Sequence, residues 1–199
     1  MPTLPPVRTL AASLLALLLA ACDPEAEPLA CEPDLTSAAE LVPLVDASAW
    51  TPSDLELDPL AAHQPELVIC PSSAWDSEAG AVEVRTGECN YWSVEQPLLD
   101  AIEVGDPLSV QVWWQSLIST SPATGHIALL IDGALVWEVE VAIPGASEAR
   151  EIELPSPIAA AAGSTVTLHL HNHGANSWTF AGLARLDPAD TNPETDGCE

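Results

Sequence analysis

Apolar and polar residues alternate with a period of two along most of the chain between residues 81 and 186. This period places every second side chain on the same face of an extended strand, so it predicts strands with one buried and one exposed face. Nine strands are predicted, at residues 67–69, 81–86, 90–95, 108–117, 126–131, 134–143, 151–154, 165–173 and 178–186. Since helical periodicity is not convincing anywhere, the pattern predicts an all-β protein.

Turn residues separate the predicted strands and favour antiparallel neighbours. Asp132-Gly133 joins two alternating runs, and Asp-Gly is the strongest short signal for a β-hairpin. Within the longest predicted strand, Val110, Val112 and Trp114 share one face, which is expected to be buried. Many short strands with turns between them predict an antiparallel β-sandwich of the jelly-roll type.

The beginning of the chain has a different pattern. Arg8 precedes a run of almost only Leu and Ala at residues 10–21, and Cys22 follows it. The run is shorter than the roughly 20 residues that span a bilayer, and it has the length of a signal-peptide core. Its last residues and the cysteine, Leu-Ala-Ala-Cys at residues 19–22, resemble the lipobox of bacterial lipoproteins. In that family the cysteine is lipidated and begins the mature chain.

The lipoprotein resemblance implies an organisation and a location. Residues 1–21 are expected to be a signal peptide, and acylated Cys22 is expected to bind the lipid bilayer of a Gram-negative-type cell envelope. Asp23 resembles an inner-membrane retention signal of enteric bacteria, but other groups do not follow that rule, so we favour the outer membrane. Residues 22–46 are expected to form an acidic, Pro-rich tether, and residues 47–199 the sandwich domain, with residues 50–64 as an arm across it.

The charge of the chain excludes one class of partner. The formal net charge is −26, with 4 Lys and Arg against 30 Asp and Glu. Such a surface repels phosphate backbones, so we expect no nucleic-acid binding. Two interpretations of the acidic surface remain open: it keeps the protein in solution, or it attracts Ca²⁺, which prefers carboxylate oxygens.

Four cysteines remain if Cys22 carries lipid. An even number in an exported chain predicts two disulfides. Of the three pairings, we favour Cys70–Cys89, which are close in sequence, and this choice leaves Cys31–Cys198. A four-cysteine zinc site is disfavoured because the chain lacks a C-x-x-C pair.

The strand rhythm and the turn at Gly105 give the predicted domain a family resemblance. Residues 80–186 resemble galactose-binding-like domains and carbohydrate-binding modules, which are jelly-roll sandwiches. The resemblance implies a glycan ligand and, in many members, a structural Ca²⁺.

Three histidines alternate along one predicted strand and form the most unusual stretch of the sequence. His169, His171 and His173 are expected to share one face, opposite apolar neighbours, and His126 is a fourth candidate ligand. Imidazole binds Zn²⁺ and Cu²⁺ at neutral pH. The row is therefore interpreted as a metal site, as a ligand platform without metal, or as an ordinary polar strand face.

Trp113 is the main candidate for a carbohydrate platform. It lies between Gln111 and Gln115 on one predicted face, where the ring can stack on a sugar while the amides bind hydroxyl groups. Asn172 and Asn176 are further candidate ligand-binding amides. The alternative is that Trp113 is covered by the arm or by the loop at residues 119–125. If the histidine row shares this face, the two candidate sites merge into one cleft.

The sequence lacks the catalytic signatures G-x-S-x-G and H-E-x-x-H and has no Gly-rich phosphate loop. We therefore expect a non-enzymatic surface lipoprotein that binds carbohydrate or another envelope component. Metal binding and a purely structural role in the envelope are the alternatives.

Overall fold

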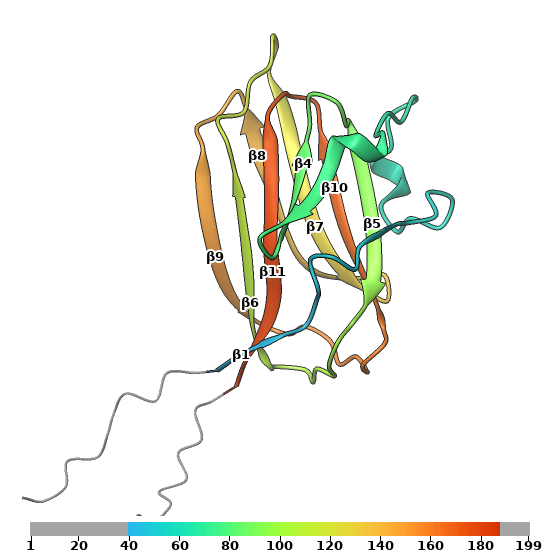
Figure 1. Cartoon of the computed structure of the whole chain (residues 1–199), viewed down its shortest axis with the longest axis vertical. Helices are drawn as coiled ribbons and strands as arrows, with labels where there is room; N and C mark the ends of the chain where they lie inside the picture. Colours follow the sequence, from blue (N-terminus) through green and yellow to red (C-terminus); the bar gives the residue numbers. More distant parts are fainter. Residues whose placement is uncertain (1–39, 188–199) are drawn as a thin grey trace, which may run out of the picture. The chain divides into compact units, whose positions relative to one another are not determined.

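Eleven strands form two antiparallel sheets in residues 40–187, the part of the chain that the computed structural model describes (Figure 1). The strands are β1 (Glu40–Pro43), β2 (Thr51–Pro52), β3 (Trp75–Glu78), β4 (Ala81–Arg85), β5 (Tyr91–Pro97), β6 (Pro107–Trp114), β7 (Ala123–Ile131), β8 (Ala134–Ile143), β9 (Glu148–Pro155), β10 (Thr165–Asn172) and β11 (Ser177–Asp187). Two short 3-10 helices, η1 (Ala61–His63) and η2 (Ser72–Ala74), lie between the early strands. The predicted all-β sandwich is confirmed.

The two sheets have different strand orders. The six-stranded sheet runs β3-β4-β11-β6-β9, and β1 also pairs with β11. The five-stranded sheet runs β2-β5-β10-β7-β8. β11 pairs on both of its edges. β6 pairs along nearly all of one edge. On the other edge, β4 pairs with the beginning of β11 and β1 pairs with its end. Among residues 40–187, no helix is long and apolar enough to cross a bilayer.

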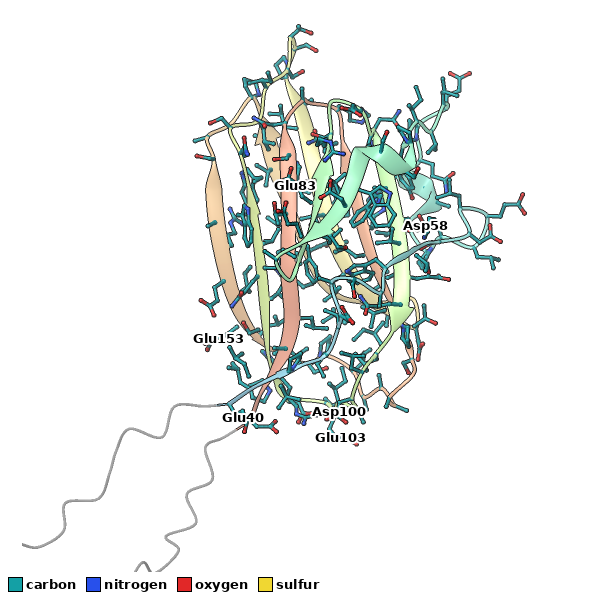
Figure 2. All side chains as sticks on the ribbon, in the orientation of Figure 1. Glu40, Asp58, Glu83, Asp100, Glu103 and Glu153 are labelled. Atoms are coloured by element: carbon teal, nitrogen blue, oxygen red, sulfur yellow. A yellow bond between two sulfur atoms is a disulfide. The ribbon has the colours of Figure 1, made fainter. Side chains whose placement is uncertain are left out.

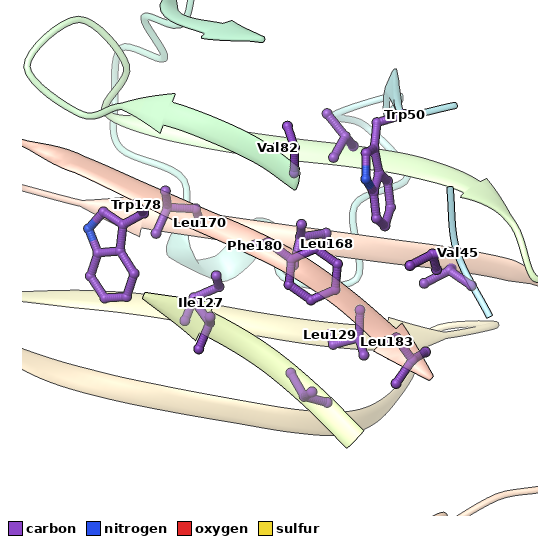
Figure 3. Close-up of a cluster of buried hydrophobic side chains, with 14 of the residues drawn as sticks. Val45, Trp50, Val82, Ile127, Leu129, Leu168, Leu170, Trp178, Phe180 and Leu183 are labelled. Carbon is purple, nitrogen blue, oxygen red and sulfur yellow. The ribbon is translucent and has the colours of Figure 1, made fainter. Parts of the chain in front are cut away.

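The side chains between the sheets follow the predicted inward faces. Val110 and Val112 are fully buried, and Leu168 of β10 faces Phe180 of β11 across the interior (Figure 3). The predicted hairpin is also present, because Asp132 and Gly133 both adopt positive φ values, 48° and 76°. Positive φ at both central residues is what a two-residue hairpin turn of this type requires.

The sandwich begins earlier than the sequence indicates. Residues 40–46 were expected in the tether, whereas β1 pairs with β11 and Leu44 is fully buried. The Leu44 amide donates to the Leu183 carbonyl (2.9 Å), and its own carbonyl accepts from the Leu99 amide (3.0 Å). An apolar segment this short has too few residues to show a period, so only its long-range pairing identifies it as a strand.

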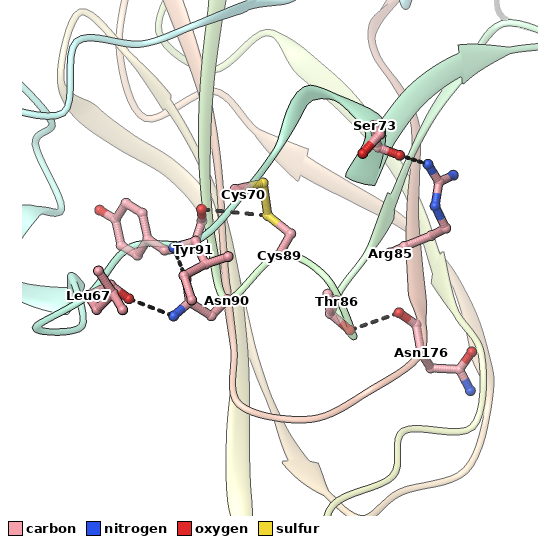
Figure 4. Close-up of a disulfide and its surroundings, with 10 residues drawn as sticks. Leu67, Cys70, Ser73, Arg85, Thr86, Cys89, Asn90, Tyr91 and Asn176 are labelled. Carbon is pink, nitrogen blue, oxygen red and sulfur yellow. Dashed lines mark hydrogen bonds between the residues drawn. A yellow bond between two sulfur atoms is a disulfide. The ribbon is translucent and has the colours of Figure 1, made fainter.

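The predicted strand at residues 67–69 is a loop instead, because a side chain takes the place of a neighbouring strand. The Asn90 amide group donates to the Leu67 carbonyl and accepts from the Ile69 amide, both at 2.8 Å. The predicted Cys70–Cys89 disulfide is present beside this contact and fastens the loop to the start of β5 (Figure 4). Cys22, Cys31 and Cys198 lie outside the described residues.

Candidate functional sites

Part of the outer face of the five-stranded sheet is covered by residues 53–64, the portion of the predicted arm that follows β2, and we keep the name arm for this portion. The Tyr91 hydroxyl on β5 donates to the carboxylate of Asp58 at 2.7 Å, and this bond fixes the middle of the arm. Burial and the Asp58 carboxylate raise the pKa of Tyr91, so the phenol stays protonated and remains a donor. Within the arm, Leu57 is exposed, whereas Asp58 is buried.

Two of the predicted metal ligands meet under this arm. His169 projects from β10 and His126 from the adjacent strand β7, with ring centroids 5.5 Å apart. His63, at the end of η1, completes the group from the arm. Donor nitrogens of these three histidines all lie within 4.8 Å of one another, and within residues 40–187 they form the one such group of potential metal ligands.

Burial keeps the two β10 histidines, His169 and His171, neutral. Burial is the main reason why the pKa of His169 is lowered to about 3. The charge of Asp58 acts against this shift, and the neighbouring imidazoles act in the same direction as burial. Burial also lowers the pKa of His171 to about 4, with smaller contributions from the surrounding histidines. A neutral imidazole has a free lone pair, which is the form that binds a metal ion.

The remainder of the predicted row is not part of this group. β10 ends at Asn172, so His173 lies in the following turn and is exposed. His171 lies beside it, with ring centroids 4.3 Å apart. His63 was missed by sequence analysis because a lone histidine in an irregular, acidic segment has no pattern. Only the docking of the arm brings it to the sheet.

Trp113 lies on the opposite side of the domain. It projects from β6 on the outer face of the six-stranded sheet, where 40% of its surface is exposed. The histidines and Trp113 therefore occupy different sheets, and the single merged cleft does not exist. The arm and the loop at residues 119–125 leave the Trp113 ring open to solvent.

A lateral row of aligned residues crosses the outer face of the six-stranded sheet and includes Trp113. The strand register aligns Asp76, Glu83, Thr179, Trp113 and Ala149 in this order. The two residues aligned with Trp113 on the neighbouring strands, Thr179 and Ala149, are both small. Figure 2 labels Glu83, which belongs to this row, and Asp58, which belongs to the arm.

The same face forms a shallow groove of about 340 Å³ beside the indole. Its polar lining consists of the side chains of Asp76, Glu78, Glu83, Arg85 and Thr179. The guanidinium of Arg85 forms an ion pair with Asp76 at 2.9 Å, which holds both groups over the sheet. The groove thus offers an apolar ring together with hydrogen-bond acceptors and donors.

The amide side chains that were predicted to bind a ligand do not all lie near Trp113. Gln111 lies on the same face of β6 as Trp113, and its amide donates to Glu151 at 3.1 Å. Gln115 is exposed but follows the end of β6 at Trp114. Asn172 is buried, and its amide group contacts Thr86 and the Gly174 amide.

Asn176 is also engaged locally. Its side chain donates to the Ser116 carbonyl and accepts from the Ser177 amide. Asn172 and Asn176 therefore hold the turn after β10 in place, and neither lies in the groove beside Trp113.

Comparisons with known proteins describe the fold only. No protein family model matches the chain, and no curated protein matches it. Among solved structures, a carbohydrate-binding module of family 4 is similar over 75% of this chain and 96% of its own, with 10% identity and a TM-score of 0.40. A carbohydrate-binding module of family 36 in complex with calcium and xylotriose is similar over 70% and 95%, with 14% identity and a TM-score of 0.37.

A third similar structure is part of an enzyme. The Agl-KA catalytic domain matches over 76% of this chain but 29% of its own length, with 11% identity and a TM-score of 0.42. Likeness at this level carries no information about ligand or activity. A function for this chain has to be argued from its own residues.

Proposed function

We propose that the domain is a non-enzymatic carbohydrate-binding module that holds a glycan against Trp113. The observation that supports this proposal best is the exposed indole beside a polar groove, with small residues aligned on both neighbouring strands. An indole presents a flat apolar surface to the C–H face of a sugar ring, and most soluble domains bury such a side chain.

The groove also supplies hydrogen-bonding groups that suit a neutral polyol. Carboxylates of Asp76 and Glu83 can accept hydroxyl protons, and Arg85 can donate to ring or hydroxyl oxygens. The strongly acidic chain, with a formal net charge of −26, disfavours anionic polysaccharides. The ligand class that fits is therefore an uncharged glycan.

Replacement of Trp113 by Ala is expected to abolish most of this binding. A buried aromatic anchor contributes about 2 kcal/mol or more at a binding site, so affinity should fall at least about 30-fold. Retardation of the native protein in gels that contain β-glucan, xylan or galactan measures the effect. Trp113→Phe, which keeps a flat ring, should retain part of the binding.

Leu135→Ala is the matched control, because Leu135 is an exposed apolar residue on the other sheet. It should bind as the native protein does. Retardation of Trp113→Ala equal to that of the native protein would contradict the proposal. So would a native protein that none of these glycans retards, a result that favours a purely structural role in the envelope.

We also propose that the module is anchored to a bacterial envelope membrane through acylated Cys22. The support is the Leu-Ala-Ala-Cys sequence at residues 19–22, which lies outside the described residues. Each buried CH₂ group contributes about 0.8 kcal/mol, so two or more acyl chains hold a protein on a bilayer stably.

A Cys22→Ser variant tests the anchor. In a Gram-negative host, the native protein should sediment with membranes and carry the mass of the acyl groups, whereas the variant should lack that mass. Fractionation of the two membranes then distinguishes the favoured outer membrane from the inner one. An unmodified Cys22 in the native protein would refute the anchor and leave the glycan proposal untouched.

A further inference from the structure

We propose that His63, His126 and His169 together bind one divalent transition-metal ion, Zn²⁺ or Cu²⁺, between the arm and the five-stranded sheet. This site is independent of the glycan groove, which lies on the other sheet. The proposal differs from the metal site expected from the sequence, because one ligand comes from the arm and both His171 and His173 are excluded.

The spacing of the three imidazoles fits a single ion. The Nδ1 atoms of His63 and His126 are 3.2 Å apart, and donor nitrogens of all three residues lie within 4.8 Å of one another. Ligands of tetrahedral zinc with Zn–N bonds of about 2.0–2.1 Å lie about 3.4 Å apart. Small side-chain rotations therefore bring all three nitrogens onto one ion.

Unpaired buried nitrogens point to a ligand that the protein alone does not supply. His169 is fully buried, and within residues 40–187 neither of its ring nitrogens has a hydrogen-bond partner. A buried polar atom without a partner costs about 1–3 kcal/mol. A metal ion bonded to one of these nitrogens would remove much of that cost.

The sheet leaves room for the arm to reach His169. The residues aligned with His169 on the two neighbouring strands are Ser93 and Ala128, both of which are small and buried. The His63 ring can therefore approach to a centroid separation of 5.7 Å. Larger side chains at those two positions would occupy this space.

Carboxylates around the three imidazoles complete the expected surroundings of a cation. Nε2 of His126 lies 2.9 Å from the carboxylate of Glu138 on β8. A ligating histidine usually donates its other N–H group to such an acceptor, which leaves Nδ1 free for the metal. Asp58, in the arm, is close enough for its negative charge to act on His169.

The chemistry of the ligand set selects the kind of metal. Three imidazole ligands suit Zn²⁺ or Cu²⁺, whereas Ca²⁺ and Mg²⁺ prefer oxygen ligands. Because His63 belongs to the arm and the other two ligands belong to β7 and β10, a bound ion would fasten the arm to the sheet.

Calorimetric titration of the full-length protein, purified without a histidine tag and treated with chelator, tests the site. ZnCl₂ and CuSO₄ are the probes, and we expect at least one of them to bind tightly at one equivalent. His63→Ala should weaken this binding at least about 100-fold, and His173→Ala should leave it unchanged. His63 lies on the arm outside the core, so its removal leaves both sheets intact, which circular dichroism verifies.

The carboxylate partner gives a second, matched pair of variants. Glu138→Gln should weaken metal binding by about 10–100-fold, the usual effect of losing such a partner. Glu153→Gln changes an exposed glutamate of β9, on the other sheet, and should have no effect. Absence of one-equivalent binding for both metals, or a His63→Ala variant that binds as tightly as the native protein, would overturn the proposal. Glycan retardation should be the same with and without metal, so each proposal can fail alone.

Discussion

Acidification of the metal-free protein from about pH 6.5 to about pH 3 is expected to lower its free energy of unfolding by roughly 3–5 kcal/mol through His169 alone. Burial under the arm depresses the pKa of this imidazole from 6.5 to about 3 in the folded protein. The groups that face it are Asp58, which raises the pKa, and the imidazoles of His63, His126 and His171, which lower it.

The direction of the effect follows from the protons that each state binds. Above pH 6.5, His169 is neutral in both states and the full stability is present. Between pH 6.5 and pH 3, the unfolded chain takes up a proton that the folded protein does not, so stability falls as the pH falls. Below pH 3, both states are protonated and this contribution stops changing.

Urea unfolding in chelator at a series of pH values measures the slope. A His169→Leu variant removes the titrating group from the buried position and should show a shallower dependence between pH 6.5 and pH 3. His173→Leu changes an exposed histidine and should keep the native slope. Equal slopes for the native protein and His169→Leu would show that the buried imidazole does not control this loss.

Removal of the Cys70–Cys89 disulfide is the second change with a large expected effect. The two residues are 19 positions apart in the sequence. A cross-link that closes a loop of this length stabilises a protein by about 3 kcal/mol in the chain-entropy model. We expect the double variant Cys70→Ala, Cys89→Ala to lose about that much, because the loop at residues 67–74 is otherwise fastened mainly by the Asn90 amide.

Urea unfolding of the oxidised native protein and of the double variant gives the difference directly. Asn90→Ala is a useful comparison, because it removes the hydrogen bonds and leaves the cross-link. A reducing agent added to the double variant then reports on the predicted Cys31–Cys198 pair, since a further loss of stability requires a second disulfide. Identical unfolding midpoints for the oxidised native protein and the double variant would contradict the prediction.

The two candidate sites differ in how far the sequence could define them. Alternation along residues 108–117 assigned Trp113 to the face opposite Val110 and Val112, and the structure confirms this assignment. The same alternation placed His169 opposite Leu168. It could not indicate that the histidine face is covered, since the covering segment is irregular.

The alternation of apolar and polar residues also could not predict short strands that pair with distant parts of the chain. β1, β2 and β3 each contain at most four residues, too few for a period to be recognised. Residues 67–69 have the composition of a strand, yet the Asn90 side chain satisfies their backbone groups. In both cases, the group that bonds to the segment's backbone, either a neighbouring strand or a side chain, decides whether a strand forms. The local composition does not.

The sequence by itself determined that this chain folds as a β-sandwich, which side chains of the regular strands point inward, and where the main hairpin turns. It favoured Cys70–Cys89 among three possible pairings, and the structure confirms that choice. These properties depend on periodicity or on residues close together in the chain. Only the tertiary structure decided that Trp113 and the histidines occupy opposite sheets, and that His63 joins His126 and His169. The arm docks through isolated contacts such as the Asp58–Tyr91 hydrogen bond, and a single long-range contact leaves no repeating pattern in the sequence.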